Sequence, residues 1–389
     1  MFPKRSPSPF LPHHYVRLLR GGRDYFGLLE KMIHEARHTI HLQVYIFDED
    51  TTGKKIAAAL IEAANRGIQV FVLVDGYASQ NLSRGFIQTL RHAGIYFRRF
   101  EPLMRSKHLY FGRRLHHKVV VVDAERCLVG GLNISDRYND TPEKAAWLDW
   151  ALYVEGVIAG VLDTVCNRRT RNRSFMRSVF PEPGSLTTFL PKGDCAVRVR
   201  INDWVHRKRE ISNSYLEMFR NASSSLIIMS PYFMPGNEFR KRMRIAIRHG
   251  VKIQVILAGI SDISLSKYAE RFVYRWLLKN RIEIYEYQQE VLHGKIAVCD
   301  GEWMTAGSYN INDLSAHASI ELNLDVSNTT FSEHVTAQLM EIMKTDCIRI
   351  TEETYHHDTS LLGRILQRCA YDITRILLFL FTFYLRQRD

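Results

Sequence analysis

Two stretches of the chain carry the same chemically active side chains at the same spacing. The first reads His116-x-Lys118, then four residues, an aspartate, six residues and a Gly-Gly-x-Asn turn. The second starts at His293-x-Lys295 and repeats every interval before ending in Gly-Ser-x-Asn. Agreement at so many fixed positions is far beyond chance for an average composition. The sequence therefore predicts one functional unit built from a duplicated motif.

The residue types in this motif suit a phosphate ester. Histidine and lysine two residues apart on a strand point to the same face. If the two copies meet, two ammonium groups can stabilise charge on phosphate oxygens without a metal or cofactor, helped by Asn133, Ser308 and Asn310. The two histidines supply a nucleophile and an acid/base whose pKa values lie naturally near neutrality. A lone histidine is usually structural, but a matched pair inside identical frames is not.

The elements around the motifs also repeat. Each half runs helix, strand, helix, strand, helix, strand and then motif, from a helix near 25–37 in the first half and from NSYLEMFRNASSS in the second. Alternating helices and strands, with glycine after the helices, are typical of an α/β fold. The apolar runs KVVVVD and IQVFVLVD predict strands buried on both faces. We predict two α/β sandwich halves packed as a pseudo-dimer around one shared active site.

Composition changes along the chain divide it into four segments. We predict a first half at 1–166, a connection at 167–195 that is basic and then contains Pro and Gly, a second half at 196–350, and a C-terminal amphipathic segment at 351–389. One site needs only these two halves, so a monomer is sufficient.

The bulk properties limit the partners. The 389 residues carry a net charge of +12, which indicates a polyanionic partner such as nucleic acid, an anionic membrane surface or a phosphate-bearing substrate. The six cysteines form no C-x-x-C pair, and we expect reduced core thiols rather than a zinc site or disulfides. The N-terminus lacks the apolar core of a signal peptide, and no apolar run approaches the roughly 18 residues needed to cross a bilayer. Any membrane contact is therefore expected to be peripheral.

The duplicated H-x-K-x₄-D motif resembles that of the phospholipase D superfamily. The resemblance implies that one histidine attacks phosphorus to form a covalent phosphohistidine, while the other protonates the leaving alcohol and deprotonates the incoming one. It assigns the nucleophile to His116 and the acid/base to His293, an order that the residues alone leave open. It gives the motif aspartates, Asp123 and Asp300, a structural role.

The same resemblance implies two further acids, Asp149 in WLDWALYVEG and Glu321 in SAHASIELNLDV. A carboxylate on the far ring nitrogen of a histidine fixes its tautomer and stabilises the imidazolium. The family implies a crossed arrangement, in which each acid serves the histidine of the other half. Tyr45 and Tyr232 end equivalent strands, and either could line the site or pack in the core.

Within the superfamily the sequence is most similar to those of bacterial cardiolipin synthases, in the segments SPYFMPG, NRIEIYEYQQEVLHGKIAVCDGEW and GGLNISDRY. This resemblance implies transfer of a phosphatidyl group from phosphatidylglycerol to the hydroxyl of a second phospholipid, with release of glycerol. Many relatives begin with two transmembrane helices that this chain lacks, so the acceptor stays open among phosphatidylglycerol, phosphatidylethanolamine, glycerol and water.

The expected partner is an anionic membrane surface on the cytoplasmic face of a bacterial cell membrane, with no nucleic acid. LLGRILQRCAYDITRILLFLFTFYLRQRD combines arginines with a dense apolar face, as an interfacial helix does, although it could instead cap the core. The basic stretches RSKHLYFGRRLHHK and RRTRNRSFMR could attract lipid headgroups. Two rival functions stay open: a phosphodiesterase that hydrolyses phospholipid or nucleic acid, and an inactive lipid- or nucleic-acid-binding module.

Overall fold

The structure is a computed structural model, and it describes residues 9–102, 113–142, 144–170, 192–312, 319–357 and 360–386, with backbone alone for 378–386. Most of the basic stretch before His116, most of RRTRNRSFMR, and the apolar side chains near the end of the C-terminal segment lie outside the described parts.

The first half follows the predicted order of elements. Its helices and strands are β1 (Leu11–Arg20), α1 (Arg23–His34), β2 (Thr39–Val44), α2 (Thr51–Asn65), β3 (Gln69–Asp75), α3 (Arg84–His92), β4 (Tyr96–Phe100), β5 (Arg114–Leu115), β6 (Lys118–Val122), β7 (Arg126–Gly130), β8 (Trp150–Glu155) and α4 (Val157–Thr170). A short 3₁₀ turn, η1, covers Asp136–Tyr138.

The second half repeats this order and adds a C-terminal extension. Its elements are β9 (Cys195–Asp203), η2 (Trp204–His206), β10 (Lys208–Arg209), α5 (Glu210–Asn221), β11 (Ser225–Met229), α6 (Asn237–Arg248), β12 (Lys252–Ala258), α7 (Ser264–Lys279), β13 (Glu283–Tyr287), β14 (Ile296–Cys299), β15 (Trp303–Gly307), β16 (Ser319–Ser327), α9 (Thr329–Thr345), β17 (Cys347–Ile350), α10 (Glu352–His357) and α11 (Leu361–Arg386).

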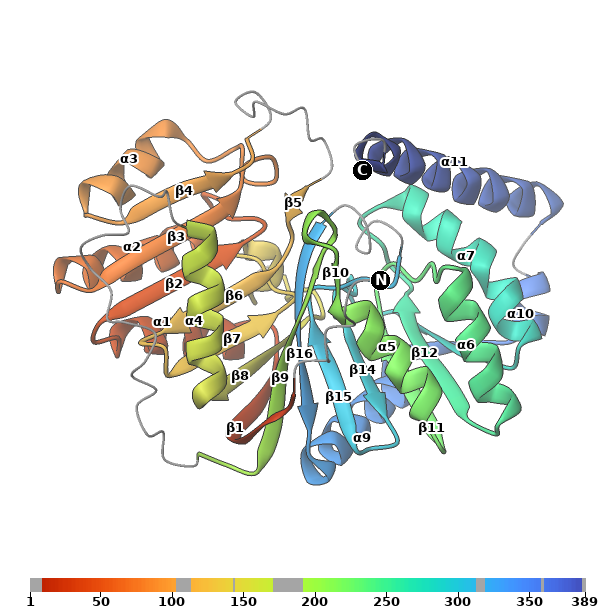
Figure 1. Ribbon diagram of the computed structural model, residues 1–389. Helices are drawn as coiled ribbons and strands as arrows, with labels where there is room; N and C mark the ends of the chain where they lie inside the picture. Colours follow the sequence, from red (N-terminus) through yellow and green to blue (C-terminus); the bar gives the residue numbers. More distant parts are fainter. Residues whose placement is uncertain are drawn as a thin grey trace.

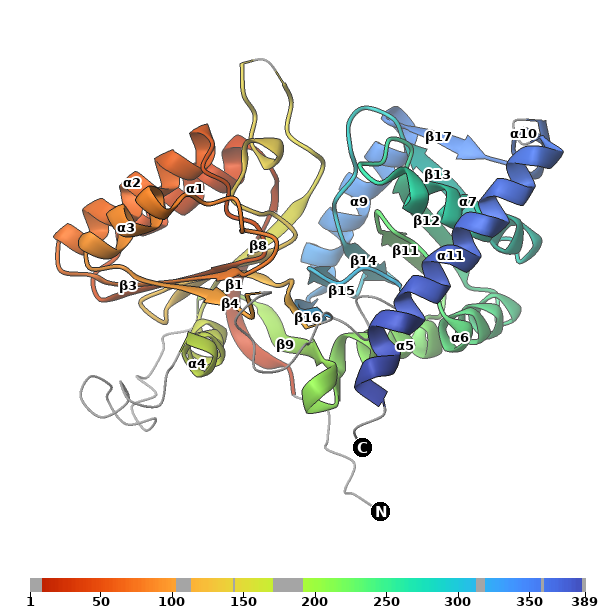
Figure 2. The ribbon, with the colours of Figure 1, turned by 90° about the horizontal axis from the view of Figure 1, so that it is seen from above.

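The two sheets have the same strand order. The first runs β4-β3-β2-β6-β7-β8-β1 and the second β13-β12-β11-β14-β15-β16-β9, with β17 added at the outer edge. The start of β1 also pairs with β9, so the sheets adjoin at the middle of the molecule (Figure 1). In the first half α1, α2 and α3 cover one sheet face and α4 the other, and in the second half α5, α6 and α7 cover one face and α9 the other (Figure 2). The predicted pair of α/β halves is confirmed.

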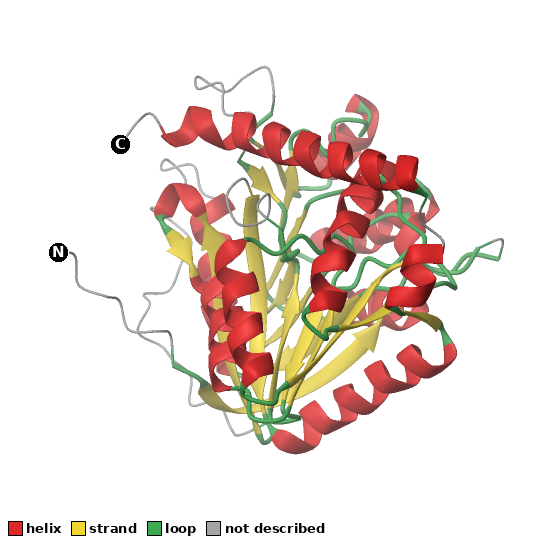
Figure 3. Ribbon diagram, turned by 90° about the vertical axis from the view of Figure 1, so that its right-hand side faces the viewer, coloured by secondary structure: helices red, strands yellow, loops and turns green. Residues whose placement is uncertain are grey.

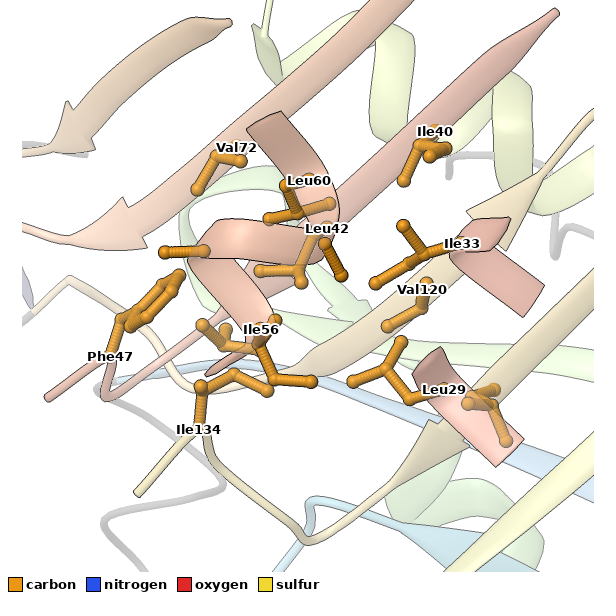
Figure 4. Packing of buried hydrophobic residues seen from close by; sticks show 14 of the residues in the cluster. Leu29, Ile33, Ile40, Leu42, Phe47, Ile56, Leu60, Val72, Val120 and Ile134 are labelled. Atoms are coloured by element: carbon orange, nitrogen blue, oxygen red, sulfur yellow. The ribbon is translucent and has the colours of Figure 1, made fainter. Parts of the chain in front are cut away.

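Three apolar cores hold these layers together. One lies between the first sheet and α1 to α3, where Leu29, Ile56 and Val120 meet (Figure 4). A matching core lies under α5 to α7. The third joins the halves, since it contains Val119 from β6, Ile296 from β14 and residues of both α4 and α9. Because β6 faces one core on each side, all five of its residues are buried, as the run KVVVVD predicted.

Two expectations about the whole chain can be compared with the structure. Four of the six cysteines are buried, but Cys347 is only partly buried and Cys369 is exposed on α11, so the prediction of core thiols was wrong for these two. Cys369 is exposed because it lies on the outward face of a helix with only one packed side. Among the described residues, no helix has the length and hydropathy to span a bilayer.

Candidate active site

The two motif histidines lie at the junction of the halves. His116 occupies the gap between β5 and β6, and Lys118 is the first residue of β6. His293 and Lys295 lie directly before β14, which starts at Ile296. The two motifs are close enough to interact electrostatically across the junction. The charge of Lys295 acts to lower the pKa of His116, and the charge of Lys118 acts to lower the pKa of His293. The structure thus gathers both motifs into one site.

Each histidine is hydrogen-bonded to a carboxylate from the opposite half. Nδ1 of His116 donates to Glu321, with its two carboxylate oxygens at 2.9 and 3.0 Å. Nδ1 of His293 shares a hydrogen bond of 2.6 Å with Asp149. Both carboxylates are completely buried. Because Nδ1 of each ring faces a carboxylate, Nε2 is left as the ring nitrogen that can act on a substrate.

Backbone hydrogen bonds fix this crossed arrangement. The amides of His293 and Gly294 donate to the carbonyl of Leu148, beside Asp149, at 2.8 and 2.9 Å. The amide of His116 donates to the carbonyl of Ile320, beside Glu321, at 3.0 Å. Each histidine therefore gains both its backbone anchor and its carboxylate from one short segment of the other half.

The lysines are buried beside the histidines. Nζ of Lys118 donates to the backbone oxygen of His116 at 2.6 Å and lies 5.3 Å from the ring centre of Tyr45. Nζ of Lys295 contacts the backbone oxygen of His293. Burial lowers the pKa of Lys118 to about 7 and that of Lys295 to about 8. An anion placed between them would favour their charged forms.

The motif aspartates lie at the far ends of the motif strands and organise turns. Asp123 accepts three backbone N–H bonds from residues 37–39, at 2.7 to 2.9 Å. Asp300 does the same for Ser223, Ser224 and Ser225, at 2.7 to 2.9 Å. Both residues have positive φ, at 55° and 52°. Both carboxylates hold a preceding turn onto the motif strand, at the end of the strand opposite the histidine.

The glycine-rich turns differ between the halves at Gly131, which Ser308 replaces, and at the following residue. A Cβ at Gly131 would lie 2.2 Å from the carboxylate of Asp149, so a side chain there would displace this acid. The second half carries Ser308 instead, and its hydroxyl donates to Glu321 at 2.5 Å. Ser319 also donates to Glu321, at 2.7 Å. The hydroxyl hydrogen of Ser308 is therefore engaged with Glu321 in this structure.

Both motif asparagines are buried in the turns that follow β7 and β15. Asn133 accepts from the amide of Ile46 at 3.0 Å and donates to the hydroxyl of Tyr138 at 2.9 Å. Asn310 is buried in the equivalent turn, two residues after Ser308. Asn133 thereby links the turn after β7 to the end of β2.

The two carboxylate–histidine pairs have different electrostatic character. Burial raises the pKa of Asp149 to about 7. Burial also acts to raise the pKa of Glu321, but the hydrogen-bonded His116 and Ser308 and the nearby charge of Lys118 lower it below its ordinary value. Burial lowers the pKa of both histidines, and more so for His293, next to the two lysines. Near neutral pH, Glu321 stays ionised while the His293–Asp149 pair can exchange a proton.

Aromatic side chains surround the histidines, and most were not predicted. Tyr45 meets the ring of His116 at 4.9 Å, edge to face. Tyr138 and Trp147 lie 5.2 and 6.1 Å from the ring of His293. Tyr138 falls in GGLNISDRY and Trp147 in WLDW, both near motif residues, but nothing in their spacing assigns them to the second histidine.

Residues 29–148 and 215–343 match the family described as "Cardiolipin synthase, PLD-like domain". The chain belongs to this family. Each matched segment contains one motif histidine, His116 in the first and His293 in the second, in keeping with the duplicated fold.

Individual relatives agree with this membership. Cardiolipin synthase B of Escherichia coli K12 is 33% identical over 343 residues, which cover 87% of this chain and 82% of the relative. The major cardiolipin synthase of Bacillus subtilis is 29% identical, with 89% of this chain and 71% of that protein covered. Among solved structures, phosphatidylserine synthase of Haemophilus influenzae superposes with a TM-score of 0.75 over 95% of both chains at 14% identity. That structural likeness shows the shared fold.

Proposed function

We propose that this protein is a phospholipase D-type phosphatidyl transferase that acts as a cardiolipin synthase. Nε2 of His116 attacks the phosphorus of phosphatidylglycerol, and His293, protonated on Nε2 while Nδ1 faces Asp149, gives the Nε2 proton to the departing glycerol oxygen. His293 then removes the proton from the hydroxyl of a second phospholipid, whose oxygen attacks phosphorus and releases His116. Each step makes one bond to phosphorus and breaks one. The single observation that carries the proposal is the pair of histidines bonded to opposite carboxylates within a cardiolipin synthase family chain.

The asymmetry of the two pairs supports this division of labour. Ionised Glu321, held by two serine hydroxyls, keeps the proton of His116 on Nδ1 and leaves Nε2 as a neutral nucleophile. The pair of His293 with Asp149, whose pKa is raised to about 7, can both give and take a proton near neutrality.

The lysines would hold the phosphate in this reaction. Lys118 and Lys295 would bind the non-bridging oxygens and stabilise the charge that develops on them. Among the other expected phosphate ligands, Asn310 keeps its proposed role. Ser308 is better described as a positioning residue for Glu321, because its hydroxyl already donates to that carboxylate. Asn133 similarly supports the first turn through Ile46.

We further propose that α11, within the C-terminal segment 351–389, rests on the cytoplasmic face of an anionic membrane. One side of α11 packs on α7, with Tyr371 lying 4.8 Å from Phe272, and Gln367 and Ala370 buried. The opposite side exposes a row of large apolar residues: Leu361, Leu362, Ile365, Leu366, Ile373, Ile376 and Leu377. A helix that leaves so many large apolar side chains in water favours an apolar partner.

Charge and placement favour a membrane as that partner. The side chains of Arg364, Arg368 and Arg375 are exposed. Because successive residues are turned by about 100° around a helix axis, these arginines fall along one edge of the apolar row, where they could reach lipid headgroups. In Figure 1 α11 lies across the top of the second half and its C-terminal end points to the junction with the first half. Figure 3 shows the same helix lying along the top of the molecule. A membrane at this surface would meet the site from the side where the halves adjoin.

The direct test incubates purified protein with phosphatidylglycerol in mixed micelles, with and without EDTA, and identifies products by mass. Cardiolipin and free glycerol are expected in both samples. Phosphatidic acid without cardiolipin would make the protein a hydrolase. Absence of turnover of any phospholipid would contradict the proposal, and cleavage of DNA in the same buffer would then favour the nuclease alternative.

A further inference from the structure

The side of the site that belongs to His293 carries an acid outside the duplicated motif, Asp262. It lies in the loop between β12 and α7, where its side chain is exposed. One of its oxygens accepts a hydrogen bond from the hydroxyl of Tyr232 at 2.5 Å. The corresponding loop of the first half, residues 76–83, contains no acid. The nearest acid, Asp75 at the end of β3, is buried and accepts hydrogen bonds from the amides of Leu115 and Tyr77.

Strand geometry brings Asp262 and Tyr232 to the catalytic residues. β11 is antiparallel to β14, with Met229 opposite Ile296, so residues 230–232 continue alongside Lys295 and His293. β12 is parallel to β11, so the loop that follows β12 emerges at the same edge of the sheet. Asp262 also interacts electrostatically with the site. Its negative charge acts to raise the pKa values of His293 and Lys295, which burial lowers.

The loop that presents Asp262 is anchored at its start and forms a local turn around Asp262. Its first residue, Gly259, donates to the carbonyl of Tyr287 at 2.9 Å, and a Cβ at this position would lie 2.3 Å from that oxygen. The side chain of Ser261 accepts from the amide of Ile263 at 3.2 Å. A carboxylate on an anchored turn, further held by Tyr232, is placed in advance rather than free to turn away.

An ionised carboxylate accepts hydrogen bonds and donates none, so it selects ligands that carry hydrogen-bond donors such as hydroxyl groups. In the proposed reaction, the alcohol oxygen must lie at His293, which exchanges its proton. The departing glycerol of phosphatidylglycerol carries two more hydroxyls next to that oxygen. An entering alcohol uses the same place, because the second step reverses the geometry of the first.

We propose that Asp262, held by Tyr232, forms the subsite that recognises the extra hydroxyls of a polyol, whether free glycerol or the glycerol headgroup of a lipid. This inference rests on the proposed function and adds its acceptor class. Alcohols with a neighbouring hydroxyl are thereby favoured over water and over simple alcohols. Exposed Ile260, Ile263 and Leu265 around the same loop could meet the acyl part of a lipid acceptor.

The test measures how one phosphoenzyme divides between two acceptors. Phosphatidyl-p-nitrophenol serves as a donor without glycerol, and glycerol and propan-1-ol compete at equal concentrations in one sample. The ratio of phosphatidylglycerol to phosphatidylpropanol is independent of total turnover. Wild type should prefer glycerol, and Asp262→Asn should reduce that ratio about tenfold, as expected when a charged hydrogen-bond acceptor is lost. Asp194→Asn, at an exposed acid before β9, serves as the matched control.

The outcomes separate the inference from the function on which it rests. An unchanged product ratio in Asp262→Asn would overturn the subsite. If both products fell equally, the ratio would also be unchanged, and Asp262 would instead act in proton transfer. A second sample replaces free glycerol with phosphatidylglycerol vesicles; loss of cardiolipin there identifies the lipid headgroup as the polyol, and loss of the free-glycerol product alone identifies glycerol. Failure of wild type to release p-nitrophenol would instead contradict the proposed function.

Discussion

At the scale of single residues, the site depends on cations that are only partly charged before substrate binds. Burial removes water from the ammonium groups of Lys118 and Lys295 and lowers their pKa values to about 7 and about 8. The negative charges of Glu321 and Asp149 act in the opposite direction. A bound phosphodiester would stabilise both charged forms. The lysines therefore link affinity for the lipid phosphate to pH.

The first prediction concerns this pH dependence. Below their pKa values the lysines are charged and bind the phosphate; as pH rises through about 7 to about 8 they lose protons and binding weakens. We expect kcat/KM for phosphatidylglycerol to fall over that range, while kcat falls only at higher pH because bound substrate raises both pKa values. Initial rates from about pH 6 to about pH 9.5 would measure this. A flat kcat/KM above neutrality would contradict the assignment.

Several site residues could be predicted from the sequence, and others could not. His116, Lys118 and their partners in the second half were evident because one spacing occurs twice. The roles of Asp149 and Glu321 came only from the family resemblance, since nothing local to these residues links them to a histidine in the other half. Asp262 lies in a loop without motif or periodicity, and only packing brings it beside His293.

At the scale of elements, α11 has three faces that differ in chemistry. One packs on α7, the next exposes apolar side chains, and the edge beside it carries arginines. The sequence predicted an amphipathic segment, but it could not distinguish a helix that caps the core from one that meets a membrane. The structure shows the packed face on α7, while contact of the exposed apolar row with a membrane stays a proposal.

The second prediction replaces part of this apolar row. The triple variant Ile365→Glu, Ile373→Glu and Ile376→Glu should bind vesicles containing anionic lipid at least about tenfold more weakly, because charged side chains oppose insertion into the acyl region. Met340→Glu provides the control: Met340 is 54% exposed and Ile376 57%, but Met340 lies on α9, at the bottom of Figure 1. Vesicle sedimentation measures both. Equal binding by the triple variant and wild type would return α11 to a purely structural role.

At the scale of the whole molecule, neither half contains a complete site. His116 needs Glu321 and His293 needs Asp149, and both links cross the junction. The central core and the pairing of β1 with β9 join the halves within one chain. The repeat was readable from the sequence because both copies keep the same order of elements. The way the copies exchange carboxylates depends on contacts over 144 and 205 positions, which local patterns do not encode.

The third prediction follows from a site completed within one chain. Co-expressed His116→Ala and His293→Ala proteins should show no more phosphatidyl transfer than either variant alone, because each chain keeps its own defective site. Wild type co-expressed with either variant provides the reference for recoverable activity, and circular dichroism confirms that the variants are folded. Restored activity in the mixture of the two variants would mean that sites form between chains.

The central claim is a covalent intermediate on His116 that His293 later resolves. The most direct measurement reacts phosphatidyl-p-nitrophenol with His293→Ala and with His116→Ala, then locates any phosphatidyl group by mass spectrometry of peptides under alkaline conditions. p-Nitrophenolate leaves without a proton, so the first step needs no acid. His293→Ala should release a burst of p-nitrophenol and carry the phosphatidyl group on His116, while His116→Ala should show neither. A label on His293 in the His116→Ala protein, or no label in either, would contradict the account.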